Sequence, residues 1–256
     1  MKAYVHFIIY GTFSTADFDR MDWSDFRASH PEMTVEYSDA KSSDNVLSLI
    51  QEGAIAEMMN QENFELAERT RAATSAIVIS GYRNDNSVEN LDSIHLDTVA
   101  VALHELAIAV LDLLTIRLFS CNDWLQMQES AQIAQDQSQH VMVYVSPMSD
   151  GPEGQELFWL HTRGMLKFGL PDLSMQYLSY DNIDFIYAIF SMLINELSYQ
   201  RLSFNEQLGE VSTFLLPSGD ETAKLRAVLS GSEDDPDFNN VYFDIVDFSF
   251  EEAKVL

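Results

Sequence analysis

Basic side chains are scarce in this sequence. Its 256 residues include 14 Lys and Arg against 41 Asp and Glu, which gives a formal net charge of −27 at pH 7. Phosphate groups and anionic lipid surfaces repel such a chain, because proteins that bind them normally present a basic surface. We therefore expect no binding to nucleic acid or to a membrane. A field of this sign attracts cations and basic proteins, and the alternative is that it only keeps the protein soluble.

Cysteine and long apolar runs are also nearly missing. Cys121 is the single cysteine, which excludes an intramolecular disulfide and a multi-cysteine metal site, and no histidine lies near it in sequence to activate it. The longest apolar stretch is interrupted by His104, Glu105 and Asp112, which a membrane span does not tolerate. The amino terminus lacks the basic region and cleavage site of a signal peptide. These features predict a soluble, cytoplasmic protein.

The motifs that identify catalytic and metal sites are absent as well. The sequence contains no G-x-S-x-G elbow, no P-loop and no G-x-G-x-x-G. The segment from His104 to Ile108 begins like a zincin helix but has Ile where the second histidine is required. His95 and His104 would fall on opposite sides of a helix at about 100° per residue, so a metal site with Asp97 is disfavoured. We expect no metal, no cofactor and no enzymatic activity.

The residues that are present suffice for a folded core. Hydrophobic residues make up 46% of the chain, with 16 Phe, 10 Tyr and 3 Trp. Strand patterns occupy residues 2–10, 33–39, 75–82, 107–112, 140–147, 156–164, 172–178, 211–217 and 240–250. Helical patterns occupy residues 15–29, 43–70, 91–106, 121–132 and 182–200.

Turn residues between the strands at 140–147 and 156–164 indicate a hairpin, which argues against a purely parallel sheet. We predict an α+β fold with a mixed, largely antiparallel sheet and helices packed on one face, arranged in two layers or subdomains. The predicted parts are an N-terminal α/β half, 1–127, and a C-terminal α+β half, 140–256, with the boundary in the polar segment 128–139. A single domain stays open.

Two acidic segments are candidates for binding a basic protein. Both interleave carboxylates with aromatic rings, the first over residues 16–26 and the second over the tail segment 234–252. The candidate residues are Asp17, Asp19, Asp22, Trp23, Asp25, Asp234, Asp235 and Asp237. Rings supply contact area and charges steer association, although amphipathic elements with their rings in the core would give the same pattern. The leading hypothesis is an acidic, non-enzymatic binding protein, such as an immunity-type or DNA-mimicking inhibitor of a basic partner, of unknown oligomeric state.

The segment HTRGMLKFGLPDLSM, residues 161–175, is the second candidate site. We expect Arg163 and Lys167 to pair with Asp172 or Glu156, and the glycines to form a turn between two strands. The alternative is a hydrolase-like enzyme site in which His161 and Arg163 contact an anion beside Asp172.

This segment also carries a resemblance. From Phe158 to Met175 a strand is followed by T-R-G-M, then F-G, then P-D-L and another strand. The pattern resembles the uncharacterised bacterial domain-of-unknown-function family 4261. The resemblance implies a bacterial, cytoplasmic α+β protein, and it implies no catalytic residues.

Overall fold

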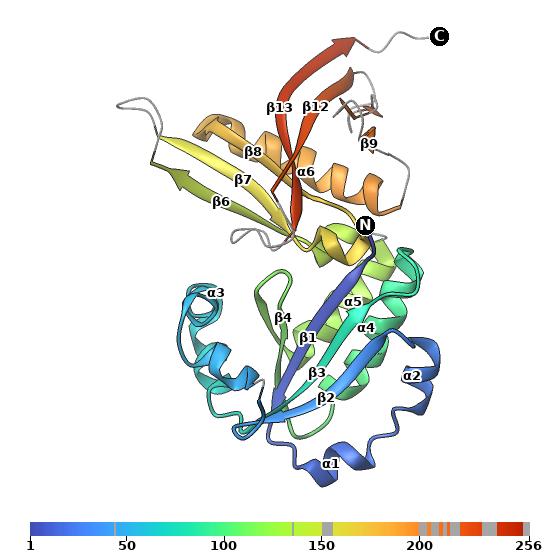
Figure 1. Ribbon diagram of the computed structural model, residues 1–256. Coiled ribbons are helices and arrows are strands. Elements are labelled where there is room, and N and C mark those ends of the chain that lie inside the picture. The colour runs from blue at the N-terminus through green and yellow to red at the C-terminus, as the bar shows by residue number, and fades with distance from the viewer. Residues whose placement is uncertain are drawn as a thin grey trace. The chain divides into compact units, whose positions relative to one another are not determined.

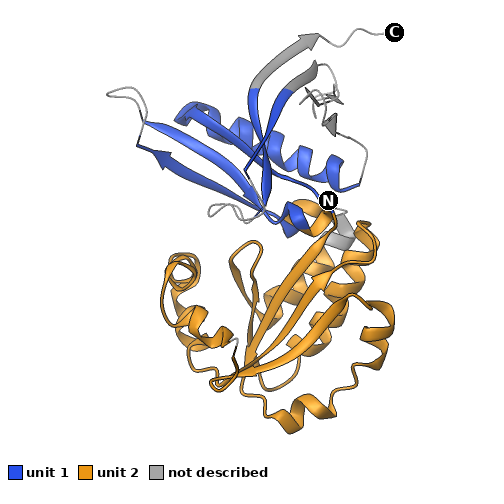
Figure 2. Cartoon of the chain, in the orientation of Figure 1, with its two compact units in different colours: residues 1, 140–166, 170–256 blue, residues 2–139, 167–169 orange. Residues whose placement is uncertain are grey.

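The computed structural model describes residues 1–43, 45–134, 136–149, 156–199, 204–205, 210–211, 214–215, 221–231 and 240–252. The chain forms two compact units, which Figure 2 distinguishes by colour. We call residues 2–139 with 167–169 the N-terminal unit, and residues 1, 140–166 and 170–256 the C-terminal unit. Both contain helices and a mostly antiparallel sheet, so the predicted α+β class is confirmed.

The N-terminal unit is built on a five-stranded antiparallel sheet with the order β2-β3-β1-β4-β5 (Figure 1). Its strands are β1 (Tyr4–Gly11), β2 (Met33–Asp39), β3 (Ser75–Tyr82), β4 (Ala107–Asp112) and β5 (Arg117–Ser120). Its helices are α1 (Thr15–Arg20), α2 (Ser24–Ser29), the 3-10 helix η1 (Val46–Ile50), α3 (Ala54–Thr70), α4 (Val88–Ala102) and α5 (Cys121–Ala134). The aliphatic and aromatic run of β1 is buried because this strand lies between β3 and β4.

Helices cover both faces of this sheet, whereas the prediction placed them on one face. On one face, Ile8 and Tyr10 of β1 belong to an apolar cluster with residues of η1 and α3. On the other face, the ring of Phe7 lies 5.1 Å from Trp124 of α5 and 5.9 Å from His95 of α4. Neighbouring side chains of a strand point to opposite faces, so β1 supplies both cores. The inner side of α4 is thereby fixed against the sheet.

The C-terminal unit has a second sheet with the order β6-β7-β8-β13-β12-β10-β9, and β11 pairs with β12. Its strands are β6 (Met142–Met148), β7 (Leu157–Arg163), β8 (Asp172–Ser179), β9 (Phe204–Asn205), β10 (Glu210–Val211), β11 (Phe214–Leu215), β12 (Glu221–Gly231) and β13 (Val241–Glu252). Strands β6 and β7 form the predicted hairpin, and β8 pairs with β13 in parallel.

The remaining helices include one long helix, α6 (Ile183–Ser198), which contacts β7 and β8. The short 3-10 helices are η2 (Gln137–His140), η3 (Met165–Phe168) and η4 (Tyr180–Asn182). In this sheet, Leu160 of β7 and Leu173 of β8 are fully buried apolar side chains. In the described ranges no helix, α6 included, combines the length and the apolarity that crossing a membrane requires.

Two helix predictions are wrong in detail. The helix expected over residues 15–29 is divided into α1 and α2, because the backbone at Met21 is extended, with φ −71° and ψ 127°. The helix expected from Ser43 onward begins as the 3-10 helix η1, and α3 starts only after Gly53. Gly53 has φ 90°, a conformation that interrupts a helix and favours glycine.

Lys167 forms its ion pair with Asp112, not with either predicted partner, Asp172 or Glu156. Its ammonium group contacts Asp112, the last residue of β4, and both side chains are at most 2% exposed. The predicted partner Asp172 already accepts hydrogen bonds from three protein donors, among them Thr162. Beside the pair, the buried Arg83 donates to the carbonyl oxygen of Lys167. Residues 167–169 therefore belong to the N-terminal unit.

Breaking this ion pair should be costly. We expect Lys167→Met to lower the free energy of unfolding by about 3–5 kcal/mol, because Asp112 would remain buried without its cation. The matched control is Lys2→Met, which removes the exposed pair with Glu32 and should cost less than about 1 kcal/mol. Urea-induced unfolding measures both, and equal losses would contradict the assignment. The double variant Lys167→Met/Asp112→Leu should recover part of the loss.

Candidate functional site: an acidic aromatic pocket in the N-terminal unit

Two of the predicted acidic residues accept hydrogen bonds that fix the backbone before α1 and before α2. The amide and hydroxyl groups of Ser14 donate to Asp17 at 2.8 Å and 2.6 Å, which forms the capping box that begins α1. Those of Ser24 donate to Asp22 at 3.0 Å and 2.6 Å, just before α2. These hydrogen bonds lower the pKa of both carboxyl groups, so both are ionised at neutral pH.

Aromatic rings fix α2 in place. Trp23 precedes the helix, and its ring lies 5.6 Å from Phe18 and 6.3 Å from Phe26. The helix ends at Ser29, and the next residue, His30, has left the helical conformation because it precedes Pro31. The buried ring of His30 then places Nε2 3.2 Å from Oδ2 of Asp97 on α4. Helix α2 is therefore tied to α4.

Helix α4 and the turn that follows it contribute to the same pocket as α2. Asp97, Ala100 and Val101 of α4 line this pocket together with His104, which lies in the turn after the helix. His95, which was expected on the opposite side of the helix from His104, is fully buried, and its ring centroid lies 3.9 Å from that of Trp124. No spacing in the sequence reveals that Asp97 and His104 line one pocket, because α4 ends at Ala102 and the following turn places His104.

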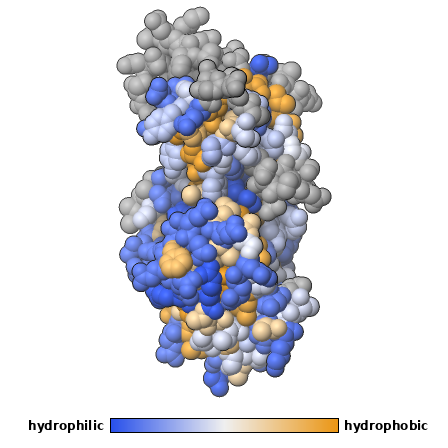
Figure 3. All heavy atoms as spheres, turned by 90° about the vertical axis from the view of Figure 1, so that its left-hand side faces the viewer, coloured by the Kyte–Doolittle hydropathy of each residue, from blue (hydrophilic) through white to orange (hydrophobic). Residues whose placement is uncertain are grey.

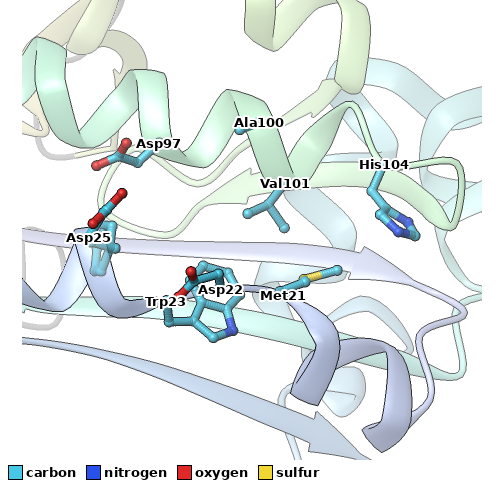
Figure 4. Close-up of a pocket in the computed structure, with 9 residues that line it drawn as sticks. Met21, Asp22, Trp23, Asp25, Asp97, Ala100, Val101 and His104 are labelled. Atoms are coloured by element: carbon cyan, nitrogen blue, oxygen red, sulfur yellow. The ribbon is translucent and has the colours of Figure 1, made fainter.

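The pocket between α2 and α4 has a volume of about 320 Å³. It is lined by Met21, Asp22, Trp23, Asp25, Phe26, Asp97, Ala100, Val101 and His104. Figure 4 shows the carboxylates of Asp25 and Asp97 facing one another at one end, and His104 at the other. Aromatic and aliphatic side chains lie between these ends, so the pocket combines an apolar wall with an anionic end.

This arrangement suits an organic cation. Ligand pockets usually enclose about 300–1,000 Å³, so this volume fits one long side chain or a small amine. An aliphatic stem would contact Trp23 and Phe26, and its charged end would reach the carboxylates. Among the described residues, no three His, Cys, Asp or Glu side chains are grouped so that they could hold a metal ion. The structure thus offers these carboxylates to a cationic group.

The other acidic candidates lie elsewhere. Asp19 is exposed on α1 and does not line the pocket. Asp234, Asp235 and Asp237 lie outside the described residues. Figure 3 shows mainly hydrophilic residues on the visible face of the N-terminal unit, in keeping with the net charge of −27.

The motif at residues 161–175 forms a strand, a turn and a strand. Strand β7 ends at Arg163, and Gly164 and Gly169 adopt φ 112° and 68° on either side of η3. Asp172, which opens β8, accepts hydrogen bonds from Thr162 Oγ1 (2.9 Å), Met165 N (3.2 Å) and Asn240 Nδ2 (2.9 Å). Complete burial raises the pKa of this carboxyl to about 6. The hydrogen bonds to Asp172 therefore stabilise the turn between β7 and β8.

The remaining polar residues of the motif are buried. The ring of His161 lies 4.2 Å from Trp159 and 5.5 Å from Tyr144. Burial and, to a smaller extent, the charge of Arg163 lower the pKa of His161 to about 4, so the imidazole is neutral at pH 7. Burial also raises the pKa of the Cys121 thiol, which disfavours the nucleophilic thiolate.

Comparisons of the chain with protein-family models, curated proteins and solved structures find no match. The resemblance over residues 158–175 stays a prediction. Any function must therefore be argued from the geometry of the site.

Asp172 should make stability depend on pH. Its folded pKa of about 6 lies above the ordinary 3.8, so the folded protein holds a proton that the unfolded chain releases. The contribution is present below about pH 4 and is lost as the pH rises through about 6, by about 3 kcal/mol in all. His161 acts in the opposite direction, because its lowered pKa costs stability as the pH falls below 6.5.

The variant Asp172→Asn isolates this contribution. Its amide oxygen can still accept from Thr162 and Met165. The hydrogen bond from Asn240 is lost, since its Nδ2 group also donates to the carbonyl oxygen of Leu170, but this cost does not change with pH. We expect the stability difference between wild type and variant to change with pH between 4 and 7 in the direction given above, as measured by urea unfolding. A difference that stays constant over this range would show that Asp172 does not titrate there.

Proposed function

We propose that this protein is a non-enzymatic, acidic binding protein whose partner is a basic protein. The pocket between α2 and α4 receives one lysine or arginine side chain of that partner. The observation that carries the proposal is the pair of facing carboxylates, Asp25 and Asp97, at the end of a pocket walled by Trp23 and Phe26.

The attraction has a short-range and a long-range part. Asp25 and Asp97 repel one another when the pocket is empty, and an entering cation replaces that repulsion by two attractions. Asp25 is exposed and the Asp97 side chain is 44% exposed, so each attraction is worth about 0.2–1 kcal/mol. At longer range, the charge of −27 steers a basic protein toward the surface and raises the association rate.

The partner that fits this pocket is a basic protein that itself binds phosphate groups. Its Lys and Arg side chains would meet carboxylates in place of phosphates, since both are anions that accept hydrogen bonds. An immunity-type or DNA-mimicking inhibitor of a nucleic-acid-binding protein is the specific form of the proposal.

The alternative, a hydrolase-like site at His161, Arg163 and Asp172, has less support. Protein donors occupy the Asp172 carboxylate, and the His161 ring is buried beside Trp159. A general base needs a free acceptor within reach of its substrate.

Calorimetry with three small probes tests the proposal. Nα-acetylarginine amide and Nα-acetyllysine amide should bind, and the uncharged Nα-acetylglutamine amide should not. We expect Asp25→Asn/Asp97→Asn to weaken binding of the two cations by about tenfold or more, since two charge-assisted contacts are lost. Raising the salt from about 50 mM to about 500 mM should also weaken binding, because it shortens the screening length.

A matched variant separates the pocket from the general charge. Glu57→Gln/Glu65→Gln removes the same two charges from exposed positions on α3, which covers the other face of the sheet. We expect its affinity to stay within about twofold of wild type, because exposed charges beyond the screening length contribute little. An equal loss of affinity in both double variants would show that the net negative charge attracts the probes and that the pocket does not bind them. Unchanged binding in Asp25→Asn/Asp97→Asn would refute the proposed function.

A further inference from the structure

The segment that leads from β8 through η4 into α6 has an unusual composition. Residues 168–200 contain no Lys, Arg or His. Within them, four large aromatic residues and two acidic ones lie between positions 177 and 187: Tyr177, Tyr180, Asp181, Asp184, Phe185 and Tyr187. We call these six residues the tyrosine surface.

The rings of the tyrosine surface are exposed to an unusual degree. The exposed fraction is 74% for Tyr180, 56% for Tyr177, 48% for Tyr187 and 44% for Phe185. The Tyr180 ring also lies 6.0 Å from Phe158 of β7, so the surface is continuous with the edge of the hairpin. Tyrosine is normally at least half buried, and exposed groups of aromatic side chains mark interaction sites.

The backbone at Tyr177 supports a role in binding. This residue has φ 59°, in the left-handed region that bulky residues rarely adopt. Its backbone N–H donates to the sulfur of Met148 on β6, 3.3 Å away, which holds it in this conformation. Strained residues that are kept in place by their neighbours concentrate at binding sites.

Exposed carboxylates accompany these rings along the chain. Asp181 and Asp184 are exposed and stand one helical turn apart, and Asp184 lies three residues before Tyr187. The exposed Glu156 precedes Leu157, which pairs with Ser179 next to Tyr180. The combination of exposed π-faces and carboxylates, with no cation in residues 168–200, is complementary to a cationic partner.

We propose that the tyrosine surface docks an arginine-rich segment of a basic partner protein. Arginine is preferred to lysine, because its planar guanidinium group stacks on an aromatic ring while it donates to a neighbouring carboxylate. A second copy of this chain is disfavoured as the occupant, because each copy carries a charge of −27. The inference goes beyond the proposed function, since this surface belongs to the C-terminal unit and does not use the pocket.

The test uses two peptides of equal charge, made of four Gly-Arg or four Gly-Lys repeats. The full-length protein carries Asp25→Asn/Asp97→Asn throughout, so that the pocket cannot contribute. We expect the arginine peptide to bind about fivefold more tightly than the lysine peptide, and the NMR ring signals of Tyr177 and Tyr180 to shift on its addition. This outcome does not depend on whether the pocket proposal holds.

Variants then locate the binding. Tyr177→Asn/Tyr180→Ser removes two exposed rings without emptying the core, and asparagine tolerates the left-handed backbone at position 177. We expect this variant to lose the preference for arginine. The control is Tyr82→Ser: Tyr82 is 51% exposed, and its ring already has Lys2 Nζ 5.5 Å from its centre. The control should bind the arginine peptide as before.

Two results would overturn the inference. One is equal affinity for the two peptides, unchanged in Tyr177→Asn/Tyr180→Ser. The other is a dimer in sedimentation experiments that the same variant abolishes, which would assign the surface to a second copy of the chain.

Discussion

The excess of carboxylates over cations is the constraint that this structure has to satisfy. With 41 acidic and 14 basic side chains, most carboxylates cannot form an ion pair within the chain. Backbone and hydroxyl donors replace the missing cations at several places. Asp17, Asp22 and Asp85 each accept two hydrogen bonds from a nearby serine, which lowers the pKa of all three. One of the scarce cations is used in the interior, where the buried Lys167 neutralises Asp112.

The other carboxylates supply the negative charge at both proposed binding sites. Around the pocket, Asp25 and Asp97 share one end with an aromatic wall. On the tyrosine surface, Asp181 and Asp184 stand among exposed rings. Both places combine aromatic contact area, which supplies strong contacts in protein interfaces, with negative charge, which steers a basic partner. The two proposals therefore follow from one physical property, although they concern different units.

Local patterns in the sequence predict most of the elements and little of the site. Alternation and β-branched runs locate the strands, and Gly164 and Gly169 adopt the unusual backbone angles expected of them. The partnership of Lys167 with Asp112 spans 55 residues, and only the folded sheet brings the two together. Asp25 and Asp97 likewise line one pocket only in the folded protein, since the sequence around each residue does not show that α2 packs beside α4. Trp23, Asp22 and Asp25 were predicted as candidates because charge and aromaticity are visible without a fold.

The most direct test of the account follows the indole N–H signals of the three tryptophans by NMR while Nα-acetylarginine amide is added. Trp124 donates to Thr98 and Trp159 donates to Ser174, so these two signals serve as internal references. Trp23 lines the pocket, and the account predicts that its signal alone moves in a saturable manner. A Trp23 signal that stays in place, or equal movement of all three, would contradict the binding of a cationic side chain between α2 and α4.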